Sequence, residues 1–468
     1  MSDNRGMAAS KAKTVARCTN CARLERKLHE LEQRIIELQA QINRNASNSS
    51  LPPSANPPWA PRAAVKKPTG AKPGGQPGHP GHCRRMAPAE QVDEIVAHAS
   101  AQCRQCGASL EGAMESSAAQ RHQVMELPRR AVKVTEHQAI VCRCGVCGAS
   151  NRGSIPRSIL CSVVGPRLTG AISFASARMH GSRRAAEEFL SQVLGAPLSL
   201  GSVMAKEQEL SAALAQPHRQ AKEAIAQAPA KNVDETGWKR AGRFLWAAAT
   251  RTLAVFHLDP CRNRDAMRQL LGEPVQGTVC SDRFSVYGKL PLEQRALCWA
   301  HLKRDFKQLS ERAACAAIGR AGEALCGKVH RLWRKFLAAA IDRPTLQRRV
   351  KRLRGQMRTL LKRGRDSACK KAAGFCRELL RLEPALWTFT RVEGIEPTNN
   401  HAERMLRPAV MWRKQSLGSH SLSGCRFVER TMTALQTLKL QGRSAIDYFE
   451  QAIHAFRHGL SPPSLLAA

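Results

Sequence analysis

The sequence predicts an α/β protein built on a mixed β-sheet, preceded by a helical coil, a linker and a small zinc-binding module. Three observations lead to this prediction. Strand-like runs surround a helical segment between residues 232 and 301, which is the pattern of a mixed sheet with a crossover helix. Two Cys-x-x-Cys-Gly motifs precede this region, and a basic segment with helical periodicity follows it between residues 302 and 393.

The expected elements of the sheet follow one another closely. Within 232–238 the sequence predicts a short strand that ends in a turn, and apolar and alternating runs predict strands at 243–250, 253–258, 278–282 and 295–301, with a helix at 263–271. Asp234 lies in the first strand just before an expected turn, and Asp282 ends the fourth. Because successive strands usually lie side by side, these two acids are expected to meet although they are distant along the chain.

Two carboxylates at neighbouring strand ends suit divalent metal ions. Mg²⁺ prefers hard oxygen ligands and needs one or two carboxylates together with substrate phosphates. Two such ions about 3.5–4 Å apart can activate an attacking oxygen and stabilise a leaving one. Asp234 and Asp282 are therefore candidate ligands for two Mg²⁺ ions, for which Mn²⁺ could substitute.

A third acid is expected from a short helix near residue 403. Asn400, Glu403 and Arg407 are spaced so that they share one helical face, and Pro408 is expected to disturb or end the helix. An amide, a carboxylate and a guanidinium on one face would suit a phosphate. Glu403 is the candidate third metal ligand, with Asn400 and Arg407 positioning phosphates.

Four motifs in this order resemble those of insertion sequence 66 family transposases of the TnpC type. They are Asp-Glu-Thr-Gly-Trp, Ser-Asp-Arg-Phe-Ser-Val-Tyr, Cys-Trp-Ala-His-Leu-Lys-Arg-Asp-Phe and Asn-Asn-His-Ala-Glu-Arg-Met-Leu-Arg-Pro. The amino-terminal coil, the Lys-Pro-Gly-Gly-Gln-Pro-Gly-His linker and the paired Cys motifs are also similar to that family. Arg283 and Phe284 differ from the residues that are most common at these two positions in that family.

The resemblance implies a DDE transposase with a ribonuclease-H-like core. Asp234, Asp282 and Glu403 would then be the catalytic acids, acting with Mg²⁺ or Mn²⁺. It also implies terminal inverted repeats and target DNA as substrates, and small companion proteins from the same element. Glu235 is a weaker candidate than Asp234, because neighbouring strand residues point to opposite faces.

The charge of the chain favours a polyanionic partner. Lys and Arg number 74 against 37 Asp and Glu, which gives a formal net charge of +37 and a pI near 10.5. Such a surplus predicts nucleic-acid binding that weakens strongly with salt. No apolar run reaches the roughly 18 residues of a membrane span, and no signal-peptide core follows the first residues, so a cytoplasmic, nucleoid-associated location is expected.

The Cys-x-x-Cys motifs predict a structural zinc site. Cys103, Cys106, Cys144 and Cys147 would supply four thiolates to one tetrahedral Zn²⁺, and Cys142 could replace Cys144. Such a site is closed to water, so it would dock DNA or stabilise the module without doing chemistry. Two further pairs with metal-ligand spacing, Cys18-x-x-Cys21 and Cys298-x-x-His301, have no second pair nearby, and packing is the preferred role for the latter.

The chain before the zinc module predicts a coil and a linker. A seam at four- and three-residue spacing indicates a short coiled coil that would make the protein a homo-oligomer, with a helix packed on its own protein as the alternative; the seam is Leu24, Leu28, Leu31, Ile35, Leu38 and Ile42. Residues 45–90 are rich in Pro, Gly and Lys and are expected to be a disordered linker.

Two helical regions flank the sheet in sequence. Residues 158–228 are expected to hold either a DNA-binding helix-turn-helix or a helical bundle that frames the sheet. Within the insertion at 302–393, the segment 348–365 has nine basic residues and no acid. A charge run is usually a solvated face, but one without acids favours DNA contact; the candidates are Arg348, Arg349, Lys351, Arg352 and Arg354.

The expected domains are therefore six: a tail and coil (1–44), the linker (45–90), the zinc module (91–157), the helical region (158–228), the catalytic core (229–410) with its insertion (302–393), and carboxy-terminal helices (411–468). The preferred function is a transposase. The alternative is a zinc-dependent DNA-binding regulator on an inactive nuclease-like scaffold. A tyrosine recombinase is disfavoured because only Tyr287 and Tyr448 exist.

Overall fold

The structure is a computed structural model, and it describes residues 19–45, 49, 86–96, 105–109, 123–125, 131–143, 146–147, 150–238, 242–416 and 419–466. Within these ranges the protein is a mixed α/β structure in which helices predominate. No helix in the described ranges is both long and apolar enough to cross a membrane.

The centre of the molecule is a five-stranded mixed sheet with the strand order β5-β4-β3-β6-β7. Three strands pair antiparallel, and β6 and β7 continue the sheet in parallel with β3. The strands are β3 (Ala230–Trp238), β4 (Arg243–Ala249), β5 (Ala254–Asp259), β6 (Thr278–Ser281) and β7 (Arg295–Leu297). The predicted mixed sheet is thus confirmed.

Two details of the predicted sheet are wrong. Instead of turning after Asp234, β3 continues to Trp238, because these residues pair antiparallel with β4. The last strand ends at Leu297, and α8 (Trp299–Ser310) begins where the sequence predicted strand. The buried residues Trp299, Leu302 and Phe306 recur at three- and four-residue spacing, a helical period that the short apolar run before them concealed.

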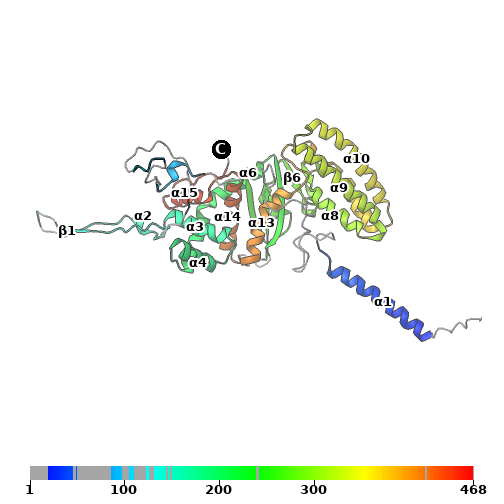
Figure 1. Ribbon diagram of the computed structural model, residues 1–468. Helices are drawn as coiled ribbons and strands as arrows, with labels where there is room; N and C mark the ends of the chain where they lie inside the picture. Colours follow the sequence, from blue (N-terminus) through cyan, green and yellow to red (C-terminus); the bar gives the residue numbers. More distant parts are fainter. Residues whose placement is uncertain are drawn as a thin grey trace, which may run out of the picture.

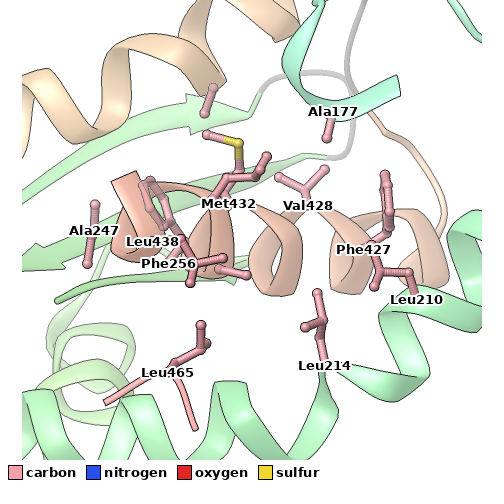
Figure 2. Close-up of a cluster of buried hydrophobic side chains, with 14 of the residues drawn as sticks. Ala177, Leu210, Leu214, Ala247, Phe256, Phe427, Val428, Met432, Leu438 and Leu465 are labelled. Atoms are coloured by element: carbon pink, nitrogen blue, oxygen red, sulfur yellow. The ribbon is translucent and has the colours of Figure 1, made fainter. Parts of the chain in front are cut away.

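Alternating residues of the sheet enter two different hydrophobic cores. Ala247 and Phe256 lie in a cluster with α14 (Leu422–Leu440) and α15 (Ala445–Arg457), whose side chains gather around α14 in Figure 2. Trp246 and Val255 lie in the opposite cluster with α7 (Arg264–Leu271). The sheet is therefore covered by helices on both faces, as expected for strands with parallel pairing.

Helices that precede the sheet form a bundle against it. They are α3 (Pro166–Arg178), α4 (Arg183–Leu194), α5 (Leu200–Ala213) and α6 (Ala215–Gln227), and the short helix α2 (Arg157–Leu160) precedes them in the chain. Ile172, Leu190 and Val203 form the small core that joins α3, α4 and α5. Leu210 of α5 lies in the main core beside α14, so these helices frame the sheet, and a DNA-binding role for them stays a prediction.

The segment between β7 and α13 forms a helical lobe at one side of the sheet (Figure 1). It consists of α8, α9 (Ala316–Leu337), α10 (Arg343–Arg365), α11 (Lys370–Arg381) and α12 (Glu383–Leu386). Its core includes Phe306 of α8, Cys326 of α9 and Leu361 of α10, and it continues to Leu297 of β7. The lobe therefore packs directly against the parallel edge of the sheet.

The helix α13 (Asn400–Ser416) follows the lobe and returns the chain to the sheet. Pro408 lies inside this helix, which runs on to Ser416. The prediction that Pro408 would end the helix is therefore wrong. A proline removes one backbone hydrogen bond. The helix nevertheless continues because Ala409 and Trp412 beyond the proline are buried in the main core.

The described amino-terminal elements are α1 (Thr19–Ile42), the 3₁₀ helix η2 (Ala89–Gln91) and a hairpin of β1 (Val141–Arg143) and β2 (Ser150–Arg152). Figure 1 shows α1 lying apart from the sheet and its helices. Its seam residues are exposed, Leu28 by 60% and Ile42 by 60%. Pairing into a coiled coil stays a prediction, and most of the expected linker at 45–90 lies outside the described residues.

Candidate active site

Asp234 lies in the middle of β3, the central strand of the sheet. Its antiparallel partner on β4 is Ala247, which belongs to the core beneath α14. Directly opposed residues of paired strands point to the same face. Asp234 therefore faces the side of the sheet that α13 and α14 cover, whereas Glu235, paired with Trp246, faces the other side.

Asp282 reaches the same place from the neighbouring strand. β6 runs parallel to β3 with Cys280 beside Asn232, so the position two residues further along each strand brings Asp282 level with Asp234. Neighbouring strands lie about 4.8 Å apart. Both acids are partly buried, and Asp282 follows the last residue of its strand, where the backbone is free to turn.

Glu403 is brought to β3 by the start of α13. The fully buried Asn399 side chain donates through Nδ2 to the Val233 carbonyl oxygen at 2.7 Å. Its Oδ1 accepts a hydrogen bond from Nδ2 of Asn232 at 3.1 Å. These two bonds tie the residue just before α13 to the strand of Asp234, and Glu403 lies in the first turn of that helix.

The three carboxylates influence one another electrostatically. The pKa of Asp234 is raised well above its ordinary value, first by burial and then by the negative charges of Glu235, Glu403 and Asp282. Like charges that approach each other in this way cost free energy unless a cation or a proton joins them. The fold thus gathers negative charge at one point of the sheet.

The three carboxylates offer the type of donor atom that a divalent metal ion prefers, although they are not yet arranged around one point. Carboxylate oxygens are the ligands that Mg²⁺ and Mn²⁺ prefer. Oε1 of Glu403 is buried and has no hydrogen-bond partner within the described part of the chain, and such an atom is costly unless a cation or donor reaches it. Among the described residues, however, no group of three or more His, Cys, Asp or Glu side chains is placed so that it could hold a metal ion.

Two residues that sequence reasoning did not assign to the site lie against Glu403. Nδ1 of His301 is 3.7 Å from Oε1 of Glu403, and Nη2 of Arg304 is 3.9 Å from the same oxygen. Burial, and then Arg304, lower the pKa of His301, while the charges of Glu403 and Asp282 oppose this shift. Both residues lie on α8. Because the start of this helix was predicted as strand, the sequence did not predict that His301 and Arg304 share one helical face.

The spacing Cys298-x-x-His301 has a structural explanation. Cys298 immediately precedes α8, is buried, and its Sγ accepts the backbone N–H of Asn399 at 3.1 Å. His301 lies nearly one turn later and points toward Glu403. The cysteine therefore fixes the junction between α8 and α13, and the histidine belongs to the acidic site.

Glu235 belongs to a separate network on the other face of β3. Its Oε2 accepts the hydroxyl of Tyr287 at 2.6 Å, and its Oε1 accepts Nη2 of Arg262 at 2.5 Å. The carboxylate thus has two strong partners of its own. It adds to the negative potential at Asp234 without facing the same side of the sheet.

The candidate phosphate-binding residues lie on two exposed helical surfaces. Asn400 and Arg407 are exposed on α13, next to the partly buried Glu403. On α10 the buried residues Met357 and Leu361 face the core of the lobe, and Figure 1 shows this helix at the outer side of the lobe. All the candidate basic residues of α10 are exposed, namely Arg348, Arg349, Lys351, Arg352 and Arg354.

Arg354 differs from the other basic residues of α10. Its guanidinium makes a two-bond ion pair with Glu383, with Nε 2.5 Å from Oε1 and Nη2 2.7 Å from Oε2. Glu383 is buried, so this arginine already has a partner that it would have to leave or share in binding DNA.

The predicted zinc ligands are only partly described. Cys103 and Cys144 lie outside the described residues, as does Cys18, while Cys106, Cys142 and Cys147 are exposed free thiols. Cys142 lies on β1 opposite Asn151 of β2. The zinc site, and the choice between Cys142 and Cys144, therefore stay predictions.

Comparison with known proteins relates the chain to one characterised family. The family model described as "Transposase IS66 family" matches residues 162–426, more than half of the chain. A model described as "Family of unknown function (DUF6444)" matches residues 8–85. An "Uncharacterized protein y4qI" of Sinorhizobium fredii (strain NBRC 101917 / NGR234) is 29% identical over 173 residues, which cover 36% of this chain and 31% of that relative. No solved structure matches the chain.

Proposed function

This chain belongs to the IS66 transposase family, and on that premise we propose that it is a DDE transposase. Asp234, Asp282 and Glu403 are its catalytic acids in this proposal, within a core that spans residues 229–410. The protein binds the terminal inverted repeats of an insertion sequence, cleaves DNA strands at its ends and joins them to target DNA.

The sheet supports a ribonuclease-H-like core. Three antiparallel strands are followed by two strands parallel to the first, which places β3 in the centre and β6 beside it. The first acid lies on the central strand and the second follows its parallel neighbour. The third acid comes from a helix that packs across the same face of the sheet. This arrangement brings together three acids that are distant in sequence.

The convergence of β3, β6 and the start of α13 carries the proposal. When bound, two Mg²⁺ ions, or Mn²⁺ in their place, supply the chemistry that activates an attacking oxygen and stabilises a leaving oxygen. Asp234, Asp282 and Glu403 would hold them. The raised pKa of Asp234 and the absence of a hydrogen bond to the buried Oε1 of Glu403 from the described residues support this role, because a bound cation would stabilise both carboxylates.

The remaining residues of the site position DNA. Water attacks the phosphorus of a phosphodiester in line, and a 3′-hydroxyl leaves as its P–O bond breaks; that 3′-hydroxyl later attacks a target phosphodiester in the same way and displaces a second 3′-hydroxyl. Asn400 and Arg407, exposed beside Glu403, bind phosphate oxygens through an amide and a guanidinium. His301 and Arg304 approach Glu403 from α8, so they orient that carboxylate and place a positive charge beside it.

The surface charge and the flanking modules serve DNA binding and assembly in this proposal. The basic face of α10 contacts the phosphate backbone, Cys103, Cys106, Cys144 and Cys147 hold a structural Zn²⁺, and α1 pairs with a second copy to give a homo-oligomer. Companion proteins of the same element, and a location on nucleoid DNA in the cytoplasm, belong to the same proposal.

The direct test uses labelled duplexes cut from the genomic DNA on either side of the gene. We expect the full chain to nick one of these duplexes only when Mg²⁺ or Mn²⁺ is present. Asp234→Asn, Asp282→Asn and Glu403→Gln should each lower the cleavage rate by about a thousandfold or more, because each removes a metal ligand. Binding of the duplex in gel shifts should be unchanged.

Asp265→Asn is the matched control, because this exposed carboxylate lies on α7 in the same domain. It should cleave like the unchanged protein. Cleavage retained by the three acid variants would contradict the assignment. Sequence-specific binding without any metal-dependent cleavage would instead favour a DNA-binding regulator on an inactive scaffold.

A further inference from the structure

Arg283, the residue next to the second acid, connects the active site with the helical lobe. Its Nε and Nη2 donate to Oδ2 of Asp305 at 3.1 Å and 2.9 Å. Its Nη1 donates to Oε2 of Glu378 at 2.5 Å. The guanidinium also lies over the ring of Phe375, 4.8 Å from its centroid, so it is held on three sides.

These partners come from two helices of the lobe. Asp305 lies on α8, and Glu378 and Phe375 lie on α11. The Arg283 side chain is 20% exposed, and those of Asp305 and Glu378 are 32% and 38% exposed. A two-carboxylate, ring-stacked arginine is a geometry that lysine cannot reproduce. The Arg283 side chain thus fastens the loop after β6 to the lobe.

The following residue fastens the same loop in the opposite direction. The ring of Phe284 lies under Arg262, 3.9 Å from the guanidinium carbon, and meets Tyr287 edge to face. Arg262 and Tyr287 are the partners of Glu235 on the far face of β3. The loop is therefore held on one side by the lobe and on the other by this network.

Asp282 is oriented by the loop that these two residues hold. Its Oδ1 accepts the backbone N–H of Phe284 at 2.9 Å, a local bond that exists only while Arg283 and Phe284 keep the turn closed. This bond uses one carboxylate oxygen and leaves the other available to a metal ion. Any movement of Arg283 would therefore change the direction of the Asp282 carboxylate.

We propose that Arg283 is a positioning residue that sets the Asp282 carboxylate for metal binding by tying its loop to α8 and α11. The inference rests on the proposed function, since it concerns the same acids. It also connects the lobe with the metal site, because displacement of α8 or α11 would move Arg283 and, through its loop, the Asp282 carboxylate.

The test measures Mn²⁺ binding to the full, zinc-loaded chain by electron paramagnetic resonance, together with thermal unfolding. Loss of a residue that orients a metal ligand typically weakens metal binding about 10- to 100-fold, and we expect this for Arg283→Ala. Arg283→Lys should rescue binding only in part. The pair Asp305→Asn with Glu378→Gln should weaken binding like Arg283→Ala, and adding Arg283→Ala to that pair should cause little further loss.

Arg268→Ala is the matched control, because Arg268 on α7 also contacts two carboxylates, those of Asp265 and Glu273. It should bind Mn²⁺ like the unchanged protein. If Arg283→Ala fails to fold, Arg283→Lys and the Asp305/Glu378 pair decide the question. Unchanged Mn²⁺ binding in these folded variants would overturn the inference.

Asp282→Asn separates this inference from the proposed function. Weakened Mn²⁺ binding in Asp282→Asn with normal binding in Arg283→Ala would reject only the role of Arg283. Unchanged Mn²⁺ binding in Asp282→Asn would reject the metal site itself, and with it both proposals.

Discussion

At the scale of single residues, the ionised Asp234 side chain destabilises the folded protein. Burial and three neighbouring carboxylates raise its pKa well above the ordinary value of 3.8. The folded protein therefore binds this proton more tightly than the unfolded chain does. The stability that the protonated form contributes is present below the ordinary pKa and is lost as the pH rises through the folded pKa.

Asp234→Asn should therefore raise the melting temperature of the protein at neutral pH when no divalent metal is added. The gain should shrink as the pH is lowered toward about 4, where the native Asp234 is increasingly protonated in both states. Thermal unfolding across a pH series checks this. Asp265→Asn, which changes an exposed carboxylate, should show no such gain. A melting temperature that falls in Asp234→Asn at neutral pH would contradict the account.

At the scale of elements, the lobe depends on close contact between α8 and α9. Gly319 and Gly322 are buried on α9, and a β-carbon at Gly322 would overlap the ring of Phe306, while one at Gly319 would overlap the backbone of Ser310. Hydrogen at these positions lets the two helices approach. The position of His301 and Arg304 on α8 therefore depends on two glycines that have no reactive side chain.

Gly322→Ala should destabilise the protein by about 1–3 kcal/mol, the usual cost of overpacking. Gly327→Ala on the same helix meets only the end of the Arg331 side chain, and it should stabilise by up to about 1 kcal/mol because alanine favours helix. Denaturant unfolding of both variants gives the comparison. Equal stability of the two would show that the α8–α9 contact is not close.

The same elements show what the sequence could and could not predict. The runs of β3, β4, β5 and β6 have apolar patterns that local reasoning recognises, and the mixed sheet followed from them. The start of α8 was missed because Trp299 extends an apolar run, and only packing against the lobe reveals its helical period. His301 and Arg283 were not assigned to the site, because their partners lie on elements distant in sequence.

At the scale of the whole molecule, a net charge of +37 sets how the protein meets DNA. Each phosphate that a basic side chain neutralises contributes about 0.9 to the slope of log affinity against log salt. Replacing four exposed residues of α10 by alanine should lower this slope by up to about 4. These residues are Arg348, Arg349, Lys351 and Arg352.

Fluorescence anisotropy with a labelled duplex at several salt concentrations measures the slope. The matched control removes the same charge from exposed positions scattered over other elements, namely Arg184, Arg219, Arg251 and Lys439. It should change the slope less than the α10 variant does. Equal slopes would mean that DNA does not lie on α10.

The most direct measurement is anomalous X-ray diffraction from crystals of the full chain grown with Mn²⁺. Anomalous density is expected within coordination distance of the carboxylates of Asp234, Asp282 and Glu403, and it should be lost in Asp282→Asn. Density that avoids these carboxylates while Mn²⁺ binds elsewhere, or a Glu403 that stays turned away from an occupied Asp234–Asp282 site, would contradict the proposed metal site.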